Sequence, residues 1–116
     1  MSLIGYTINM DNIKVINYTT STGKEPFNDW LLKLDTNTRA IIRARIARIR
    51  LGNFGDCKII KGAPGICELR IAYGPGYRVY LGKKGTTIVI LLIGGDKRSQ
   101  LRDIEKAKRY WLEYKD

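Results

Sequence analysis

The chain has 116 residues, of which 44% are hydrophobic, so it is long enough to form one domain, residues 1–116, with its own core. Its 21 lysines and arginines outnumber 11 aspartates and glutamates and give a net charge of +10. This excess favours a polyanion, nucleic acid first, or an acidic protein as partner, with a merely solubilising basic surface as the alternative. The absence of histidine excludes serine-hydrolase triads and paired-histidine ribonuclease sites.

The sequence argues against several other functional classes. No secretory signal is recognisable, and no apolar run reaches the length of a membrane span, so we expect a cytoplasmic protein without a membrane partner. Cys57 and Cys67 form no C-x-x-C pair and are expected to be free, reduced thiols. Two cysteines without histidine do not suit zinc. No P-loop or dinucleotide motif occurs, and we expect no metal and no cofactor.

The N-terminal half predicts one strand and two helices. Residues 1–11 show no clear period and read as a poorly ordered lead-in. Alternation over Asn12–Thr19 predicts a strand. Pro26 suits the start of a short amphipathic helix, and Asp35 or Thr36 begins a second helix that reaches about Leu51 and stops at Gly52. The short link between the helices predicts an antiparallel helical hairpin.

The C-terminal half switches to a period of two. The segments CKIIK, ICELRIAY, YRVYLGKKG and TTIVILLIGG predict four consecutive strands joined by short turns, an antiparallel meander. The fourth is almost wholly apolar, so we expect it to be covered on both faces. A last helix begins near Ser99. Strand, helical hairpin, four-strand meander and helix together predict a compact α+β domain.

Two arginines flank the Gly-Pro-Gly turn of the central hairpin. Alternation places Glu68, Arg70, Arg78 and Tyr80 on the face opposite the apolar residues, which we expect to be open. An odd-numbered loop, or a bulge at Gly74 and Gly76, would set the two arginines side by side, where an anion such as a phosphate would relieve their repulsion. The plain alternative is that Glu68 neutralises Arg70 or Arg78 in a surface ion pair.

Further basic residues extend this prediction. Lys97 and Arg98 follow Gly94-Gly95, and glycines there would let a ligand approach the backbone. The second helix carries five arginines within twelve residues, and Arg43 and Arg50 are candidates for a phosphate-tracking surface, unless the face is simply solvated. Tyr80, or else a neighbouring tyrosine of the hairpin, is a candidate for stacking on a nucleobase.

The segments GNFGD, ELRIAYGPGYRVYL and IVILLIGGDKRSQLRDIEKAKRYW resemble the RelE/ParE toxin superfamily, specifically its HigB-like, phage-related branch, over residues 13–112. The resemblance implies a cytoplasmic toxin of a type II toxin–antitoxin system. Its implied activity is that of a ribosome-dependent mRNA endonuclease (mRNA interferase) that inhibits translation. Its implied partners are mRNA, the ribosome and a helix-turn-helix, HigA-like antitoxin, with a toxin–antitoxin hetero-tetramer as one implied assembly.

The resemblance also suggests residue roles. Arg78 matches the arginine that holds the scissile phosphate, and Arg70 with Lys97 or Arg98 matches further basic positions, whereas Glu68 stands where many relatives carry lysine. We expect Arg78, Arg70, Lys97 and Glu68 to be catalytic, and Arg98, Tyr80, Arg43 and Arg50 to bind RNA. Two alternatives remain open on the same scaffold: a ParE-like gyrase poison, and a nucleic-acid-binding protein without catalytic activity.

Overall fold

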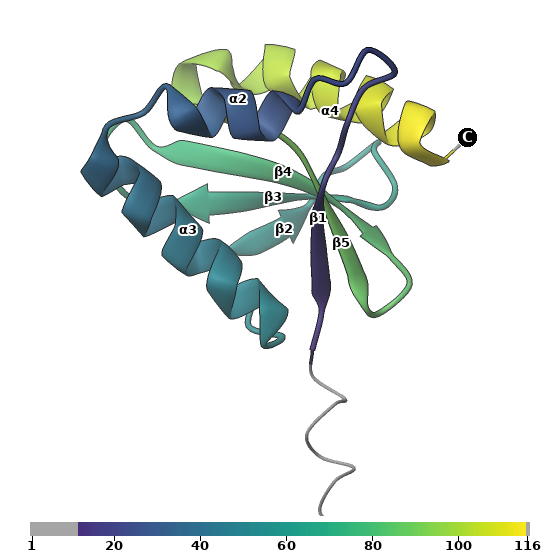
Figure 1. The fold of residues 1–116 in the computed structure, drawn as a ribbon, viewed down its shortest axis with the longest axis horizontal. Coiled ribbons are helices and arrows are strands. Elements are labelled where there is room, and N and C mark those ends of the chain that lie inside the picture. The colour runs from purple at the N-terminus through teal and green to yellow at the C-terminus, as the bar shows by residue number, and fades with distance from the viewer. Residues whose placement is uncertain (1–11, 116) are drawn as a thin grey trace, which may run out of the picture.

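The computed structural model describes residues 12–115, and within that range one five-stranded sheet carries three α-helices (Figure 1). The predicted lead-in, residues 1–11, lies outside the described residues. The elements are β1 (Lys14–Asn17), α2 (Pro26–Leu32), α3 (Thr36–Arg50), β2 (Cys57–Ile59), β3 (Ile66–Ile71), β4 (Tyr77–Lys84), β5 (Ile88–Asp96), a short 3-10 helix η2 (Lys97–Ser99) and α4 (Gln100–Lys115). The predicted α+β fold is confirmed.

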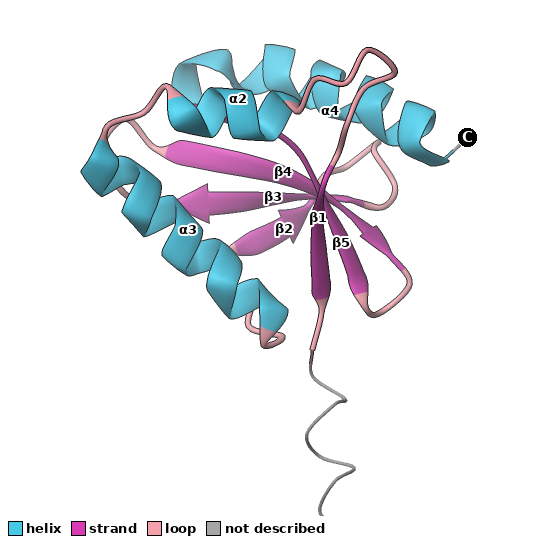
Figure 2. Ribbon diagram, in the orientation of Figure 1, coloured by secondary structure: helices cyan, strands magenta, loops and turns pink. Residues whose placement is uncertain are grey.

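The sheet has the strand order β1-β5-β4-β3-β2. The four strands β2 to β5 pair antiparallel with their neighbours in chain order, as the meander requires. β1 pairs parallel with β5, and the pairing covers only residues 88–91 of β5. Because β1 is short, the second half of β5 has no strand on that side, and the helices pack around it instead (Figure 2).

Each face of the sheet has its own core. Residues of α2 and α3 pack on one face, where alternate residues of β3 and β4 such as Leu69 and Val79 are fully buried. Residues of α4 pack on the other face, where Ile66, Tyr80 and Trp111 are buried. Both faces are thus covered, and β5 is buried throughout its middle, which confirms the expectation for that strand.

The two N-terminal helices form as predicted but diverge. Pro26 opens α2, and α3 ends just before Gly52, whose φ of 87° is a conformation that glycine adopts most readily. Figure 1 shows α3 running at a steep angle to α2 rather than alongside it. Each helix buries its own apolar stripe on the sheet, and this packing outweighs contact between the helices.

The glycine pair of β5 serves helix packing rather than ligand access, which corrects the expectation made for it. A Cβ on Gly94 would overlap the indole ring of Trp30 from α2, and a Cβ on Gly95 would overlap the carboxylate of Asp103 from α4. Both glycines are buried. Their missing side chains therefore let the two helices approach opposite faces of the same strand.

Substitution of Gly94 by alanine should therefore destabilise the fold. The added methyl group forces the Trp30 ring to move, and overpacking of this kind costs about 1–3 kcal/mol of unfolding free energy. Urea denaturation measures the loss, with Leu101→Ala as the control because Leu101 is 81% exposed. A Gly94→Ala variant as stable as the wild type would show that the helix does not need this close approach.

Tyr18 follows β1, and its hydroxyl donates a 2.5 Å hydrogen bond to Glu113 of α4. Burial, reinforced by Glu113, raises the pKa of Tyr18 to about 12 from its ordinary value of 10. The neutral phenol is therefore favoured in the folded state. Its stabilisation is fully present below pH 10 and is lost as the pH rises from 10 through 12.

We expect the wild type to lose more stability than Tyr18→Phe between pH 9 and 12, because in that range the phenol ionises readily only in the unfolded chain. Chemical denaturation at a series of alkaline pH values measures both proteins. Identical pH dependence in the two proteins would contradict the assignment of this raised pKa to Tyr18.

Candidate active site

The β3–β4 hairpin brings the two predicted arginines together. Arg70 lies directly opposite Arg78, and Glu68 lies directly opposite Tyr80. The connecting loop, residues 72–76, has an odd number of residues, as the shared face requires, and Gly74 and Gly76 have φ values of 56° and 82°. All four side chains belong to the face that α4 covers, because the alternate residues Cys67, Leu69, Val79 and Leu81 belong to the other core.

Arg78 is held by a buried carboxylate. Its side chain is only 13% exposed, and its Nε lies 3.5 Å from Oε2 of Glu68, an ion pair without hydrogen-bond geometry. Its Nη1 donates a long hydrogen bond, 3.4 Å, to the carbonyl of Gly76. The guanidinium is thus oriented by an anion on one side and the hairpin loop on the other. Of the two partners that the sequence left open for Glu68, the structure selects Arg78.

Two further donors complete the surroundings of Glu68. The same oxygen, Oε2, accepts hydrogen bonds from the Tyr80 hydroxyl at 3.0 Å and from Gln100 Nε2 at 2.8 Å. Gln100 is the first residue of α4 and lies 32 positions away in the chain. No local sequence pattern indicates this contact. Glu68 therefore ties β3, β4 and α4 together at one point.

Tyr80 is fully buried, so the expectation of an open face is wrong for this residue, and its ring has no surface on which a base could stack. Burial, followed by the neighbouring Glu68 charge, raises the pKa of Tyr80 far above its ordinary value. The phenol therefore stays protonated and acts as a permanent donor to Glu68. Among the tyrosines of the hairpin, Tyr73 is the exposed one, at 41%.

Arg70 has a different anion from Arg78. It makes a two-pronged contact with Asp56: Nε lies 3.2 Å from Oδ2 and Nη2 lies 3.2 Å from Oδ1. Arg70 is therefore not the partner of Glu68, although the sequence left that pairing open. Asp56 directly precedes β2, and the pairing of Cys57 with Leu69 sets Asp56 opposite Arg70. If the pairing of β2 with β3 is extended by one residue beyond Cys57 and Leu69, it predicts Asp56 as the partner of Arg70.

Lys97 and Arg98 follow β5 at the same end of the sheet. A Cβ on Gly76 would lie 3.8 Å from Cβ of Lys97 and 3.9 Å from Nη1 of Arg78, so the two cationic residues flank one glycine. The Lys97 side chain is exposed and forms no ion pair within residues 12–115. Arg98 pairs with Asp96 at 3.0 Å, and its hydrogen bond lowers the pKa of the Asp96 carboxyl.

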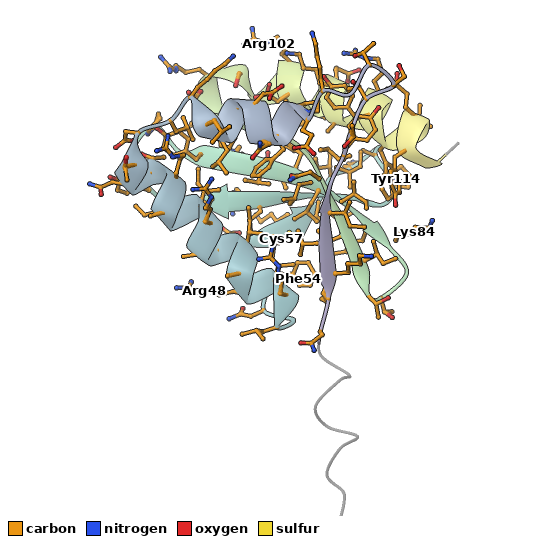
Figure 3. The ribbon with its side chains drawn as sticks, viewed as in Figure 1. Arg48, Phe54, Cys57, Lys84, Arg102 and Tyr114 are labelled. Atoms are coloured by element: carbon orange, nitrogen blue, oxygen red, sulfur yellow. The ribbon has the colours of Figure 1, made fainter. Side chains whose placement is uncertain are left out.

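The arginines of α3 lie in the other layer. Arg43 and Arg50 are exposed, but α3 packs on the face of the sheet opposite α4. Figure 3 shows their neighbour Arg48 pointing outward from α3, far from Arg102 of α4 in this view. Arg78, Arg70, Lys97 and Arg98 thus lie at one end of the sheet, whereas Arg43 and Arg50 belong to the helix on the other face, whose Arg45 reaches the carbonyl of Arg70.

This arrangement supplies cations of two kinds to a shared surface. Arg78 is fixed by Glu68, whereas Arg70 and Lys97 are exposed enough to reorient toward an anion. Among residues 12–115, no group of three or more histidine, cysteine, aspartate or glutamate side chains is placed to hold a metal ion. In the same range, no helix has the length and apolar character needed to cross a bilayer.

Comparison with known proteins finds a sequence relative and a similar solved structure. The chain is 52% identical over 83 residues to an uncharacterised protein of Haemophilus influenzae, covering 71% of this chain and 82% of that protein, and it belongs to the same family. No protein-family model matches the sequence. The structure is similar to that of the Escherichia coli toxin RelE, a double arginine-to-alanine mutant in the free state, with a TM-score of 0.62 and 13% identity over 84% of this chain and 97% of RelE. The fold is therefore RelE-like.

Removing the charge of Glu68 should destabilise the protein much more than removing that of Asp56. Glu68→Gln leaves Arg78 largely buried without a counter-charge, which typically costs about 3–5 kcal/mol. Asp56→Asn breaks an ion pair whose side chains are 38% and 51% exposed, which is worth roughly 0–1 kcal/mol. Thermal and urea denaturation of the two variants provide the measurement, and equal losses would contradict the distinction between the pairs.

Proposed function

We propose that this chain is the toxin of a HigB-like type II toxin–antitoxin module and inhibits translation by cutting mRNA on the ribosome. The observation that carries the proposal is the cluster of Arg78, Arg70 and Lys97 at one end of a RelE-like sheet, with Arg78 oriented by a buried carboxylate. Such a cluster suits a phosphate group that gains negative charge during a reaction.

The proposed reaction uses the ribose as its own nucleophile. The 2′-hydroxyl oxygen attacks the adjacent phosphorus and loses its proton, and the bond from phosphorus to the 5′ oxygen breaks. The 5′ oxygen takes up a proton and leaves as a hydroxyl, while the other fragment ends in a 2′,3′-cyclic phosphate. The phosphorane-like transition state carries more negative charge on the phosphoryl oxygens than the substrate does.

Arg78, Arg70 and Lys97 have different roles in this reaction because their side chains differ in how firmly they are oriented. Arg78 is the preorganised donor to the phosphoryl oxygens, and Arg70 joins it by exchanging the exposed Asp56 for the phosphate. Lys97 approaches from the Gly76 side, as a third cation or as the acid for the leaving oxygen. Glu68 acts through Arg78 and is therefore a positioning residue.

Dependence on the ribosome follows from the same arrangement. Arginine is a poor base because its pKa exceeds about 12. The cluster therefore stabilises charge better than it removes protons, and an mRNA positioned by the ribosome would supply the orientation, which can contribute roughly 7–11 kcal/mol. Ribosomes place the activity in the cytoplasm, and a helix-turn-helix antitoxin would keep the toxin inactive.

Replacing Arg78 by alanine should lower cleavage by about 10²–10³-fold, the typical effect of losing one preorganised donor. Because this change leaves Glu68 without its counter-charge, Arg78→Lys is a second variant. Lysine retains the charge but cannot donate two parallel hydrogen bonds to one phosphate, so this variant should lose most of the activity. Induced expression in bacteria, with sequencing of RNA 5′ ends and a thermal denaturation check on each protein, provides the measurement.

Lys24→Ala is the matched control, since Lys24 is an exposed lysine in the loop between β1 and α2. It should leave cleavage unchanged. New RNA ends that appear equally with wild type and both Arg78 variants would overturn the role of Arg78. DNA breaks and an SOS response without any new RNA ends would favour a gyrase poison, and neither effect would favour a binding protein without catalytic activity.

A further inference from the structure

α4 carries a row of cations along its solvent side. Arg102, Lys106 and Arg109, named here the α4 stripe, are separated by four and three residues. These spacings place them within an arc of about 60° when 3.6 residues make one turn. Arg102 and Arg109 are exposed and Lys106 is half-buried. The buried residues Asp103, Ala107 and Trp111 occupy the side of the helix that packs on the sheet.

The stripe borders a hollow between α4 and α2. This hollow, with a volume of about 300 Å³, is lined by Lys33, which directly follows α2, by Arg102 and Lys106 of α4, and also by Asp29 and Asp103. Asp103 is buried, and its Oδ2 accepts a 2.5 Å hydrogen bond from Ser99. Within residues 12–115, Lys33, Arg102 and Lys106 form no ion pair. Three cations thus line the same hollow as the carboxylates of Asp29 and Asp103, and none of the three is held in an ion pair among the described residues.

The stripe continues the candidate active site. Lys97 and Arg98 in η2 immediately precede α4, so cations follow one another from the Gly76 side of Arg78 onto the helix. Arg102 and Arg109 are about 10 Å apart along the helix axis at a rise of 1.5 Å per residue. This length suits contact with successive phosphates of an extended strand.

We propose that the α4 stripe and Lys33 bind the phosphate backbone of the RNA strand on one side of the phosphate held at Arg78. This inference rests on the proposed function for the identity of the strand. In this proposal the RNA strand lies along α4, whereas the sequence made the arginines of α3 candidates for that role. Contacts of this kind fix the position of the strand without reading its sequence.

The chemistry of the stripe favours RNA over an acidic protein. Stable protein interfaces need apolar or aromatic anchors as well as charge, whereas phosphate contacts need only cations. The exposed apolar residues of α4, Leu101 and Leu112, lie about 80–100° around the helix from Arg102. Leu112 borders a different hollow, beside Pro64 and Trp111. The stripe itself offers charge alone.

The test compares two triple variants of the full chain with equal loss of charge. Arg102→Ala/Lys106→Ala/Arg109→Ala removes the stripe, and Arg43→Ala/Arg48→Ala/Arg50→Ala removes three exposed arginines of α3. The probe is a fluorescein-labelled 2′-O-methyl RNA of about 20 nucleotides, which lacks the attacking hydroxyl and so cannot be cut. Fluorescence anisotropy measures its affinity at a series of salt concentrations, and circular dichroism checks folding.

Loss of the stripe should weaken binding about 10–100-fold at 100 mM salt and lower the slope of log affinity against log salt by about 2, the value for three contacts on a single strand. The α3 variant should change affinity less than about 3-fold, because α3 packs on the face of the sheet opposite α4. Equal losses in both variants would overturn the proposal. Unchanged binding in the stripe variant would also overturn it.

The binding test of the α4 stripe and the cleavage test of the proposed function can succeed or fail independently. Cleavage is measured with unmodified RNA and Arg78 variants, whereas the stripe is measured with an uncleavable strand. A selective loss of binding in the stripe variant supports the stripe even if the wild type cuts no RNA, a result that would count against the nuclease alone.

Discussion

The burial of the Glu68 carboxylate is the constraint on which this end of the molecule depends. A carboxylate removed from water destabilises a protein unless cations and hydrogen-bond donors replace the lost solvation. Here the replacements come from Arg78 and Tyr80 on β4 and from Gln100 at the start of α4. Because no single element supplies them all, the two strands and the helix must keep fixed relative positions for the charge to be tolerated.

This constraint makes two adjacent arginines unequal. Arg78 has little freedom, since its neighbour is buried and its side chain is only 13% exposed. Arg70 is held by an exposed pair with Asp56, which contributes little to stability and is readily exchanged. A phosphoryl transition state gains most from donors that are oriented before the reaction. The unequal pair therefore combines one donor fixed in advance with one that can follow the substrate.

Alternation along β3 and β4 was enough to predict which side chains share a face, because the strand period is fixed by backbone geometry. The odd-numbered loop then set Arg70 opposite Arg78. The same alternation predicted an open face, and Tyr80 shows why it was wrong: a polar residue opposite a core face looks the same in sequence whether water or a helix covers it. Gln100 reaches Glu68 from 32 residues away, and no local pattern carries that information.

The prediction of an antiparallel helical hairpin was wrong for a related reason. A short link limits the distance between the ends of two helices but leaves their angle free, and the angle here follows from the apolar stripes that each helix packs on the sheet. Two glycines in succession, such as Gly94 and Gly95, permit close approach either by a ligand or by another part of the protein, and the sequence alone does not distinguish the two. Trp30 and Asp103 decide in favour of the protein, and they come from helices on opposite faces of β5.

A count of charges overstates the cations that are available to a ligand, and α3 shows how. Arg39 donates hydrogen bonds to the carbonyls of Leu32 and Leu34, and Arg45 donates to those of Phe54 and Arg70. These two guanidiniums donate hydrogen bonds to backbone carbonyl groups in loops and at the ends of a helix and a strand. They therefore stabilise the backbone as well as contributing charge to the surface. The denser run of arginines is thus partly structural. On α4, Lys108 pairs with Glu105 and Arg109 lies over the ring of Tyr110, whereas Arg102 and Lys106 form no ion pair among the described residues. The number of cations on a helix therefore does not by itself identify the helix that binds a ligand.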